Sequence, residues 1–264
     1  MFPILFQLGP IQFYTFTLFV IVAFFASSYV FWRKGREEHY PEDELFDSLL
    51  LALFWGVVWS RVGFVVMHFD VFGLQPLSWL NVFNMPGFST LFGIVAGGWF
   101  LFNTAKKHKW DEYEVLDFGV MALALGMAIL WLGSFFSGAD FGTPTNLPWG
   151  IQFPNVFDKR HPVQLYGFIA YVLVFIYLFW VESRYRTFSW YRARKDSAQS
   201  GFLFAMFCIL WGIIGTVLWL FSPTQVWFYG VPVEPIIRFV LIVYGCVTLF
   251  QRSGRSFSLR RTKR

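Results

Sequence analysis

Seven apolar runs, separated by short polar segments, dominate this sequence of 264 residues. They cover residues 11–31, 49–67, 88–102, 116–136, 163–181, 201–221 and 236–250. A helix of about 20 apolar residues crosses the hydrocarbon core of a bilayer. Although the third and seventh runs are short, we predict an all-α, polytopic integral membrane protein, built as a bundle of seven transmembrane helices.

The composition favours a membrane domain over a soluble one. Hydrophobic residues make up 56% of the chain and charged residues only 14%, whereas soluble domains contain roughly 25% charged residues. No linker or repeat divides the sequence, so we expect one membrane domain at residues 1–251 and a basic cytoplasmic tail at 252–264. Cys208 and Cys246 lie in apolar runs, where packing is expected rather than a disulfide or a metal site.

The basic residues lie mainly on one side of the predicted membrane. Of the 21 Lys and Arg residues, 17 follow the first, third, fifth and seventh runs, whereas loops on the other side hold only Lys159 and Arg160. Because cytoplasmic loops are rich in Lys and Arg, the N-terminus is expected outside and the C-terminus in the cytoplasm. Contact with anionic lipid headgroups then accounts for the net charge of +5, and nucleic acid is not expected as a partner.

Ionisable residues at membrane depth are costly and therefore mark candidate sites. Arg61 lies six residues before the end of the second run, about 9 Å deep at a rise of 1.5 Å per residue. Two interpretations stay open: its side chain faces inward towards a partner, or it snorkels to the interface. Glu234 and Arg238 are spaced i, i+4 at the outer end of the seventh helix, which predicts an ion pair or, alternatively, a contact with a ligand.

More polar residues gather at the predicted outer ends of the helices. They are Tyr14, Ser134, Ser137, Asp140, Lys159, Arg160 and His161. Cationic side chains there suit a lipid phosphate, and Asp140 or His161 is a candidate general base. The alternative interpretation is ordinary helix-end residues and, for Tyr14, an interfacial aromatic anchor. The sequence has no Gly-rich phosphate loop and no His/Cys metal spacing, so no cofactor and no metal ion are expected.

The order of several motifs resembles the prolipoprotein diacylglyceryl transferase family. The closest match is Arg160-His161-Pro162-Val163-Gln164-Leu165-Tyr166, which keeps the family pattern R-H-P-x-Q-L-Y. Weaker matches are Leu8-Gly9-Pro10 with Tyr14, Gly56 with Ser60 to Phe64, Ser200-Gly201 and Trp211-Gly212. Together these matches follow the family order over most of the chain.

The resemblance implies a seven-helix enzyme of the bacterial plasma (inner) membrane. Members of that family transfer the diacylglyceryl group of phosphatidylglycerol to the Cys thiol of a prolipoprotein, whose signal peptide is then a partner. The resemblance also implies lipid or phosphate contacts, with His161 as the candidate catalytic residue. The implied contact residues are Tyr14, Arg61, Ser134, Arg160, Gln164 and Tyr166.

Several motif positions that carry charge or acid–base chemistry in the family hold other residues here. Leu91 stands in place of a His. One family motif carries an Arg, two Asn and a Glu, and the matching residues here are Trp131, Ser134, Ser137 and Ala139. A second motif carries an Arg, a Glu and an Arg, and the matching residues here are Gly215, Trp219 and Ser222. Release of glycerol phosphate needs cations on the phosphate and a base for the thiol.

Three hypotheses follow from this pattern. The residues alone favour a non-catalytic relative that binds phospholipid or a lipoprotein precursor. The second hypothesis is a diverged, active diacylglyceryl transferase that uses Tyr14, Arg61, Arg160 and His161. The third is a small transporter, for which discontinuous spans would be expected.

Overall fold

The computed structural model describes residues 2–9, 11–82, 84–154, 156–185, 199–223, 227 and 230–252. Within them each apolar run forms a long helix: α1 (Thr15–Glu37), α2 (Glu42–Met67), α5 (Thr90–Lys107), α6 (Glu112–Ser137), α7 (Val163–Tyr185), α8 (Phe202–Leu220) and α9 (Val233–Arg252). Six of these helices, all except α5, are long and apolar enough to span a membrane. The all-α, polytopic class is confirmed, and the seventh span stays a prediction. Residues 186–198 and 253–264, with the basic residues they hold, lie outside the described residues.

The starts of α1 and α2 differ from the prediction in ways that the local sequence explains. The first helix was expected from residue 11, but Ile11–Tyr14 form strand β2, which pairs with β1 (Ile4–Leu8) in an antiparallel hairpin. Gly9 has a φ of +58° in the turn, a conformation that glycine adopts readily. α2 begins at Glu42 rather than at residue 49, because three acidic residues in its first turn favour a helix N-terminus.

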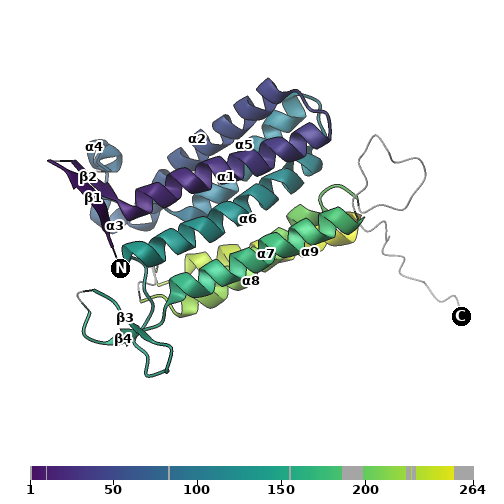
Figure 1. Ribbon diagram of the computed structural model, residues 1–264. Coiled ribbons are helices and arrows are strands. Elements are labelled where there is room, and N and C mark those ends of the chain that lie inside the picture. The colour runs from purple at the N-terminus through teal and green to yellow at the C-terminus, as the bar shows by residue number, and fades with distance from the viewer. Residues whose placement is uncertain are drawn as a thin grey trace, which may run out of the picture.

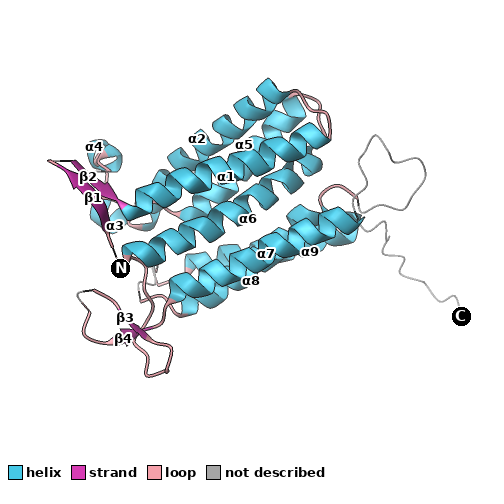
Figure 2. Ribbon diagram, in the orientation of Figure 1, coloured by secondary structure: helices cyan, strands magenta, loops and turns pink. Residues whose placement is uncertain are grey.

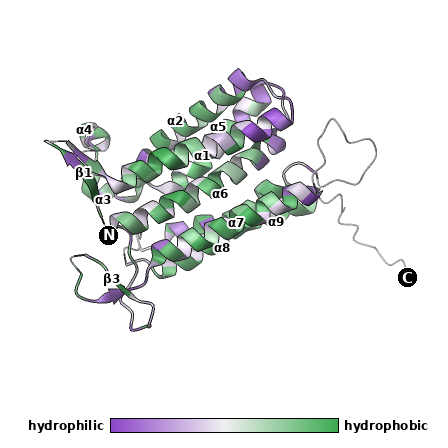
Figure 3. Ribbon diagram, viewed as in Figure 1, coloured by the Kyte–Doolittle hydropathy of each residue, from purple (hydrophilic) through white to green (hydrophobic). Residues whose placement is uncertain are grey.

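The small elements all lie at one end of the helix bundle (Figures 1 and 2). They are the β1–β2 hairpin, the short helices α3 (Phe69–Phe72) and α4 (Pro76–Leu80), and a ribbon of β3 (Ile151–Gln152) with β4 (Lys159–Arg160). We call this end of the bundle the hairpin end. At the opposite end the tips of α1, α2, α5 and α6 are hydrophilic, whereas the middle of the helices is mostly hydrophobic (Figure 3).

α6 is the central helix and packs against α1, α5, α7 and α8. In the most apolar stretch of α6, 61% of the residues are buried within the bundle. The corresponding share in α9 is 11%, so α9 leaves most of its surface to lipid. Glycines allow the close approaches. A Cβ on Gly56 of α2 would lie 3.2 Å from the Gly93 carbonyl oxygen of α5, and one on Gly133 of α6 would lie 2.5 Å from the Cβ of Phe19. Such contacts let helices associate in lipid.

Polar contacts hold the helices together at the end of the bundle opposite the hairpin end. The Lys34 ammonium of α1 lies 2.7 Å from a carboxylate oxygen of Glu182 on α7. The Tyr40 hydroxyl donates to Glu114 of α6 at 2.6 Å. Burial, together with this bond to Glu114, raises the pKa of Tyr40 well above its usual range, so the hydroxyl stays protonated and remains a donor.

Candidate functional site

Residues 159–164 run from strand β4 into the start of α7 at the hairpin end. The His161 backbone N–H donates to the Thr143 carbonyl at 3.0 Å, and the Gly142 N–H donates to the His161 carbonyl at 2.9 Å. A Cβ on Gly142 would lie 2.8 Å from the Cβ of His161, so glycine is needed for this approach. The turn that follows α6 is therefore held against the start of α7.

Two side chains of this segment have buried polar atoms without a hydrogen-bond partner among the described residues: Arg160 at Nε and Gln164 at Oε1. Gln164 is fully buried, and its Nε2 donates to the Ala139 carbonyl. The Arg160 guanidinium lies 5.6 Å from the centre of the Phe141 ring. Buried polar groups in proteins are almost always hydrogen-bonded, so a free donor and a free acceptor together favour a polar ligand or ordered water here.

His161 belongs to a short chain of polar contacts. The Trp149 Nε1 donates to the Tyr166 hydroxyl at 2.9 Å, and that hydroxyl lies 3.3 Å from the His161 Nδ1. Since the Tyr166 oxygen already accepts from Trp149, its proton is available to His161. The His161 ring also packs against Phe221, with 4.9 Å between the ring centres. Trp149 was not among the predicted site residues, although a Trp in a polar loop beside the predicted site is a signal for such a contact.

Ser134 and Asp140 meet at the end of α6. The buried Ser134 hydroxyl donates to Asp140 Oδ2 at 2.9 Å, and the Ser137 hydroxyl donates to the Ser134 carbonyl, also at 2.9 Å. Gly138, with a φ of +77°, ends the helix. These two side chains therefore hold the turn that supports His161, and their predicted roles towards lipid or a thiol stay predictions.

Arg61 faces inward and is buried, as one of the two interpretations predicted. Its partners are backbone carbonyls of residues 78–87: Nε donates to Trp79 at 2.8 Å, and Nη1 donates to Met85 and Gly87 at 2.9 and 3.0 Å. Nη2 makes longer bonds to Ser78 and Asn81, at 3.5 and 3.4 Å. A guanidinium has five N–H donors, so all of those of Arg61 are occupied. In this conformation it holds the end of α4 and the residues that follow it, rather than offering donors to a phosphate.

The remaining sequence candidates lie apart from this segment. Tyr14 ends β2 with its side chain 53% exposed, and its hydroxyl donates to Gln12 at 3.2 Å. Glu234 and Arg238 of α9 form the expected ion pair at 2.9 Å. The predicted lipid contact of Tyr14 stays a prediction.

The replaced motif positions are filled by packing or by other side chains. Leu91 is 4% exposed and belongs to the apolar core between α5, α6, α7 and α8. The Trp131 ring packs on Gly167 of α7, where an added Cβ would lie 2.4 Å from it. Gly215 of α8 is covered by the guanidinium of Arg238. Of these three positions, only the last still holds a cation.

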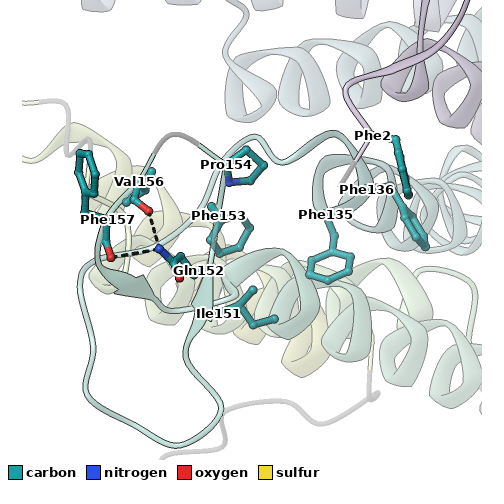
Figure 4. Close-up of a pocket in the computed structure, with 9 residues that line it drawn as sticks. All are labelled: Phe2, Phe135, Phe136, Ile151, Gln152, Phe153, Pro154, Val156 and Phe157. Atoms are coloured by element: carbon teal, nitrogen blue, oxygen red, sulfur yellow. Dashed lines mark hydrogen bonds between the residues drawn. The ribbon is translucent and has the colours of Figure 1, made fainter.

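An apolar groove of about 760 Å³ opens beside the site, between the end of α6 and the loop that joins β3 to β4 (Figure 4). Phenylalanine side chains make up most of its lining, and Phe157 is 97% exposed. The lining residues are Phe2, Phe135, Phe136, Ile151, Gln152, Phe153, Pro154, Val156 and Phe157. The Gln152 amide ties the loop by donating to the carbonyls of Val156 and Phe157, at 3.5 and 3.4 Å. This groove was not predicted from the sequence, because it forms only when the loop between β3 and β4 lies beside the end of α6.

Comparison with known proteins identifies the family of the chain. The family model of the prolipoprotein diacylglyceryl transferases matches residues 3–251. A phosphatidylglycerol–prolipoprotein diacylglyceryl transferase of Legionella pneumophila (strain Lens) is 30% identical over 191 residues, which are 70% of this chain and 73% of the relative. Those of Coxiella burnetii (strain RSA 331 / Henzerling II) and Clostridium tetani (strain Massachusetts / E88) are 29% and 24% identical, covering 70% and 80% of this chain and 72% and 81% of the relatives. The chain therefore belongs to the prolipoprotein diacylglyceryl transferase family.

Proposed function

We propose that this protein binds phosphatidylglycerol and the Cys-bearing region of a prolipoprotein, the two substrates in the names of its relatives, and that it does so without efficient transfer. The site then lies at the outer leaflet of the bacterial plasma membrane, with the hairpin end outside. The basic loops support this orientation, with the N-terminus out and the C-terminus in. Close packing of α5 on α2 supports α5 as the seventh span.

The observation that carries the proposal is the pair of unpartnered buried atoms, Arg160 Nε and Gln164 Oε1. A phosphatidylglycerol headgroup offers what these atoms lack. Its phosphate accepts from a guanidinium, and its terminal glycerol hydroxyls donate to an amide oxygen. A phosphatidylglycerol headgroup therefore carries both kinds of partner that these atoms lack.

The apolar groove suits the prolipoprotein better than a lipid tail. It lies beyond the end of α6, among the loops of the hairpin end (Figure 4). A lipid acyl chain would have to leave the hydrocarbon core to reach it, whereas an extended apolar peptide beside the acceptor Cys would not. Strand β3 lines the groove, and recognition of an extended peptide beside a strand is a common binding mode.

The replaced positions support binding without efficient transfer. Transfer would join the Cys sulfur to a glycerol carbon of the lipid, break the bond from that carbon to a phosphate oxygen, and pass the thiol proton through a base to the leaving glycerol phosphate. Leu91 and Trp131 offer neither a base nor a cation for these steps. Diacylglyceryl transfer, the function that the family match and the named relatives indicate, is the other candidate function. The motif from Arg160 to Tyr166 also favours it, because His161 lies against the Tyr166 hydroxyl.

The test measures binding and transfer on the same purified full chain. Vesicles of labelled phosphatidylglycerol, with and without a peptide carrying the acceptor Cys, are compared with phosphatidylcholine vesicles. We expect retention of phosphatidylglycerol, and no labelled peptide above a protein-free control. Labelled peptide would establish the transferase instead, and equal retention of the two lipids would refute the lipid site.

Arg160→Gln should weaken phosphatidylglycerol binding roughly tenfold, because a hydrogen bond to a charged group contributes about 1.5–3 kcal/mol. The matched control is Lys159→Gln, which removes the same charge from the exposed neighbouring position. Equal losses in the two variants would mean that general surface charge, rather than the Arg160 site, holds the lipid.

Phe157→Ser should weaken binding of the Cys peptide roughly tenfold without changing lipid binding, because a buried Phe contributes about 1.5–3 kcal/mol. Phe157 is 97% exposed in the free protein, so its loss leaves the fold intact. Leu77→Ser, on the exposed face of α4 and outside the groove, is the control. Unchanged peptide affinity in Phe157→Ser would exclude the groove as the peptide site.

A further inference from the structure

Arginine donors near the hairpin end are unequally used. Arg61 has all five N–H groups bonded to backbone carbonyls, whereas Arg238 uses two. Its Nη1 donates to the Gly215 carbonyl of α8, and its Nη2 donates to Glu234 at 2.9 Å. Among the described residues, the other N–H groups of Arg238 have no acceptor. Its side chain is 16% exposed, so these donors are neither saturated nor fully solvated.

Gly215 makes room for this guanidinium. A Cβ at position 215 would lie 2.9 Å from the Arg238 Nε and 3.2 Å from its Cδ and Cζ. Any larger residue would therefore push the Arg238 side chain away from α8. Without a side chain at this position, Arg238 Nη1 reaches the Gly215 carbonyl and donates to it.

A second donor without an acceptor lies on the same face of α8. Trp219 follows Gly215 by four residues, one helical turn, and its buried Nε1 has no hydrogen-bond partner among the described residues. Arg238 lies five residues into α9 from Val233, about 7.5 Å along the axis. Side chains lean towards the helix N-terminus, which brings the guanidinium closer to the hairpin end. Both donors therefore lie at the depth where lipid headgroups meet the hydrocarbon core.

We propose that Arg238 and Trp219 form an anion subsite between α8 and α9 that takes the phosphate of an anionic phospholipid. This inference rests on the proposed function and names a second phosphate-binding position on the protein, besides that of Arg160. A phosphate diester accepts from the free guanidinium N–H groups and from the indole N–H at once. α9 is the least buried of the six candidate spans, so a phospholipid reaches the subsite from the bilayer. Glu234 fixes one edge of the guanidinium, and its negative charge limits the affinity.

Substitutions that are expected to change the lipid affinity in opposite directions test the subsite in the full chain, with phosphatidylglycerol in nanodiscs as the probe. Arg238→Gln should lower the affinity roughly tenfold. Glu234→Gln, at the other end of the same ion pair, should raise it several-fold by removing the competing carboxylate. Gly215→Arg combined with Arg238→Leu returns a guanidinium to the same space from α8 and should recover binding. Thermal midpoints of all variants show that the fold is intact.

The outcomes separate this inference from the proposed function. Wild-type binding that Arg238→Gln leaves unchanged would overturn the subsite and leave the Arg160 site standing. Losses in both Arg238→Gln and Glu234→Gln would show that the ion pair is only structural. Absence of phosphatidylglycerol binding in the wild-type protein would refute the proposed function itself. Competition by free glycerol phosphate or inorganic phosphate at the affinity of the lipid would assign the subsite to a soluble anion instead.

Discussion

Arg61→Gln should lower the thermal midpoint of the purified protein by roughly 6–12 °C. Arg61 makes five hydrogen bonds to carbonyls of residues 78–87, and its substitution leaves several of these groups buried without a donor. Losing a buried, charged hydrogen-bonding group costs about 3 kcal/mol, and in chains of this size each kcal/mol shifts the midpoint by about 2–4 °C. Limited proteolysis should also cut the segment between α4 and α5 sooner.

Arg33→Gln is the matched control. Arg33 is an exposed arginine of α1 that pairs with Glu37 at 3.1 Å, and such surface pairs contribute little. Arg61→Lys offers at most three N–H groups and should fall between wild type and Arg61→Gln. An unchanged midpoint in Arg61→Gln, together with lost lipid binding, would show that Arg61 contacts the lipid rather than the 78–87 segment.

The sequence predicts that Arg61 has a partner but does not identify that partner. Arg61 was identified because a charge at membrane depth needs a partner. The partner could not be identified, because backbone carbonyls carry no residue-type signal. Trp79 lies in the last turn of α4, where carbonyls lack a helical partner, and Met85 and Gly87 lie outside any helix. Hydrogen bonds from a side chain to backbone carbonyls can therefore be identified only in the folded structure.

The apolar runs predict the helices, and the differences lie at the helix bounds. A Gly-Pro pair between two apolar segments, as at Leu8-Gly9-Pro10, is also typical of a hairpin, and a hairpin forms here. The first residues of α2 are charged, so the apolar run that begins at residue 49 does not include them. Hydropathy finds the part of a helix that lies in lipid, whereas acidic first turns and turn residues mark where the helix begins.

The candidate site was partly predictable for a related reason. The motif from Arg160 to Tyr166 was found from its residues, and the structure places Arg160, His161 and Gln164 beside the turn after α6. The contact between Gly215 and Arg238 was not predicted, because it pairs a glycine of α8 with an arginine of α9 that lies 23 residues later. No rule of spacing within one helix predicts a contact between two helices.

Asp117→Ala is expected to destabilise the protein by about 3–4 kcal/mol, although Asp117 lies far from the hairpin end. This carboxylate of α6 is 2% exposed and accepts from the backbone N–H groups of Gly201 at 2.8 Å and Phe204 at 2.7 Å. Gly201 is the N-cap of α8 and has no side chain to cap the helix, so α6 supplies the acceptor. Two charge-assisted bonds and a favourable interaction with the helix dipole are lost together.

Hydrogen exchange at the first amides of α8 measures this effect locally, and the thermal midpoint measures it globally. Asp117→Asn keeps one acceptor oxygen and should lose about half as much as Asp117→Ala, while Asp158→Ala, at an exposed position, should change stability by less than about 0.5 kcal/mol. Similar midpoints for Asp117→Ala and Asp158→Ala would mean that α8 is held only by its apolar packing. A large loss would instead show that the position of α8, and with it of Gly215 and Trp219, depends on a carboxylate at the opposite end of the bundle.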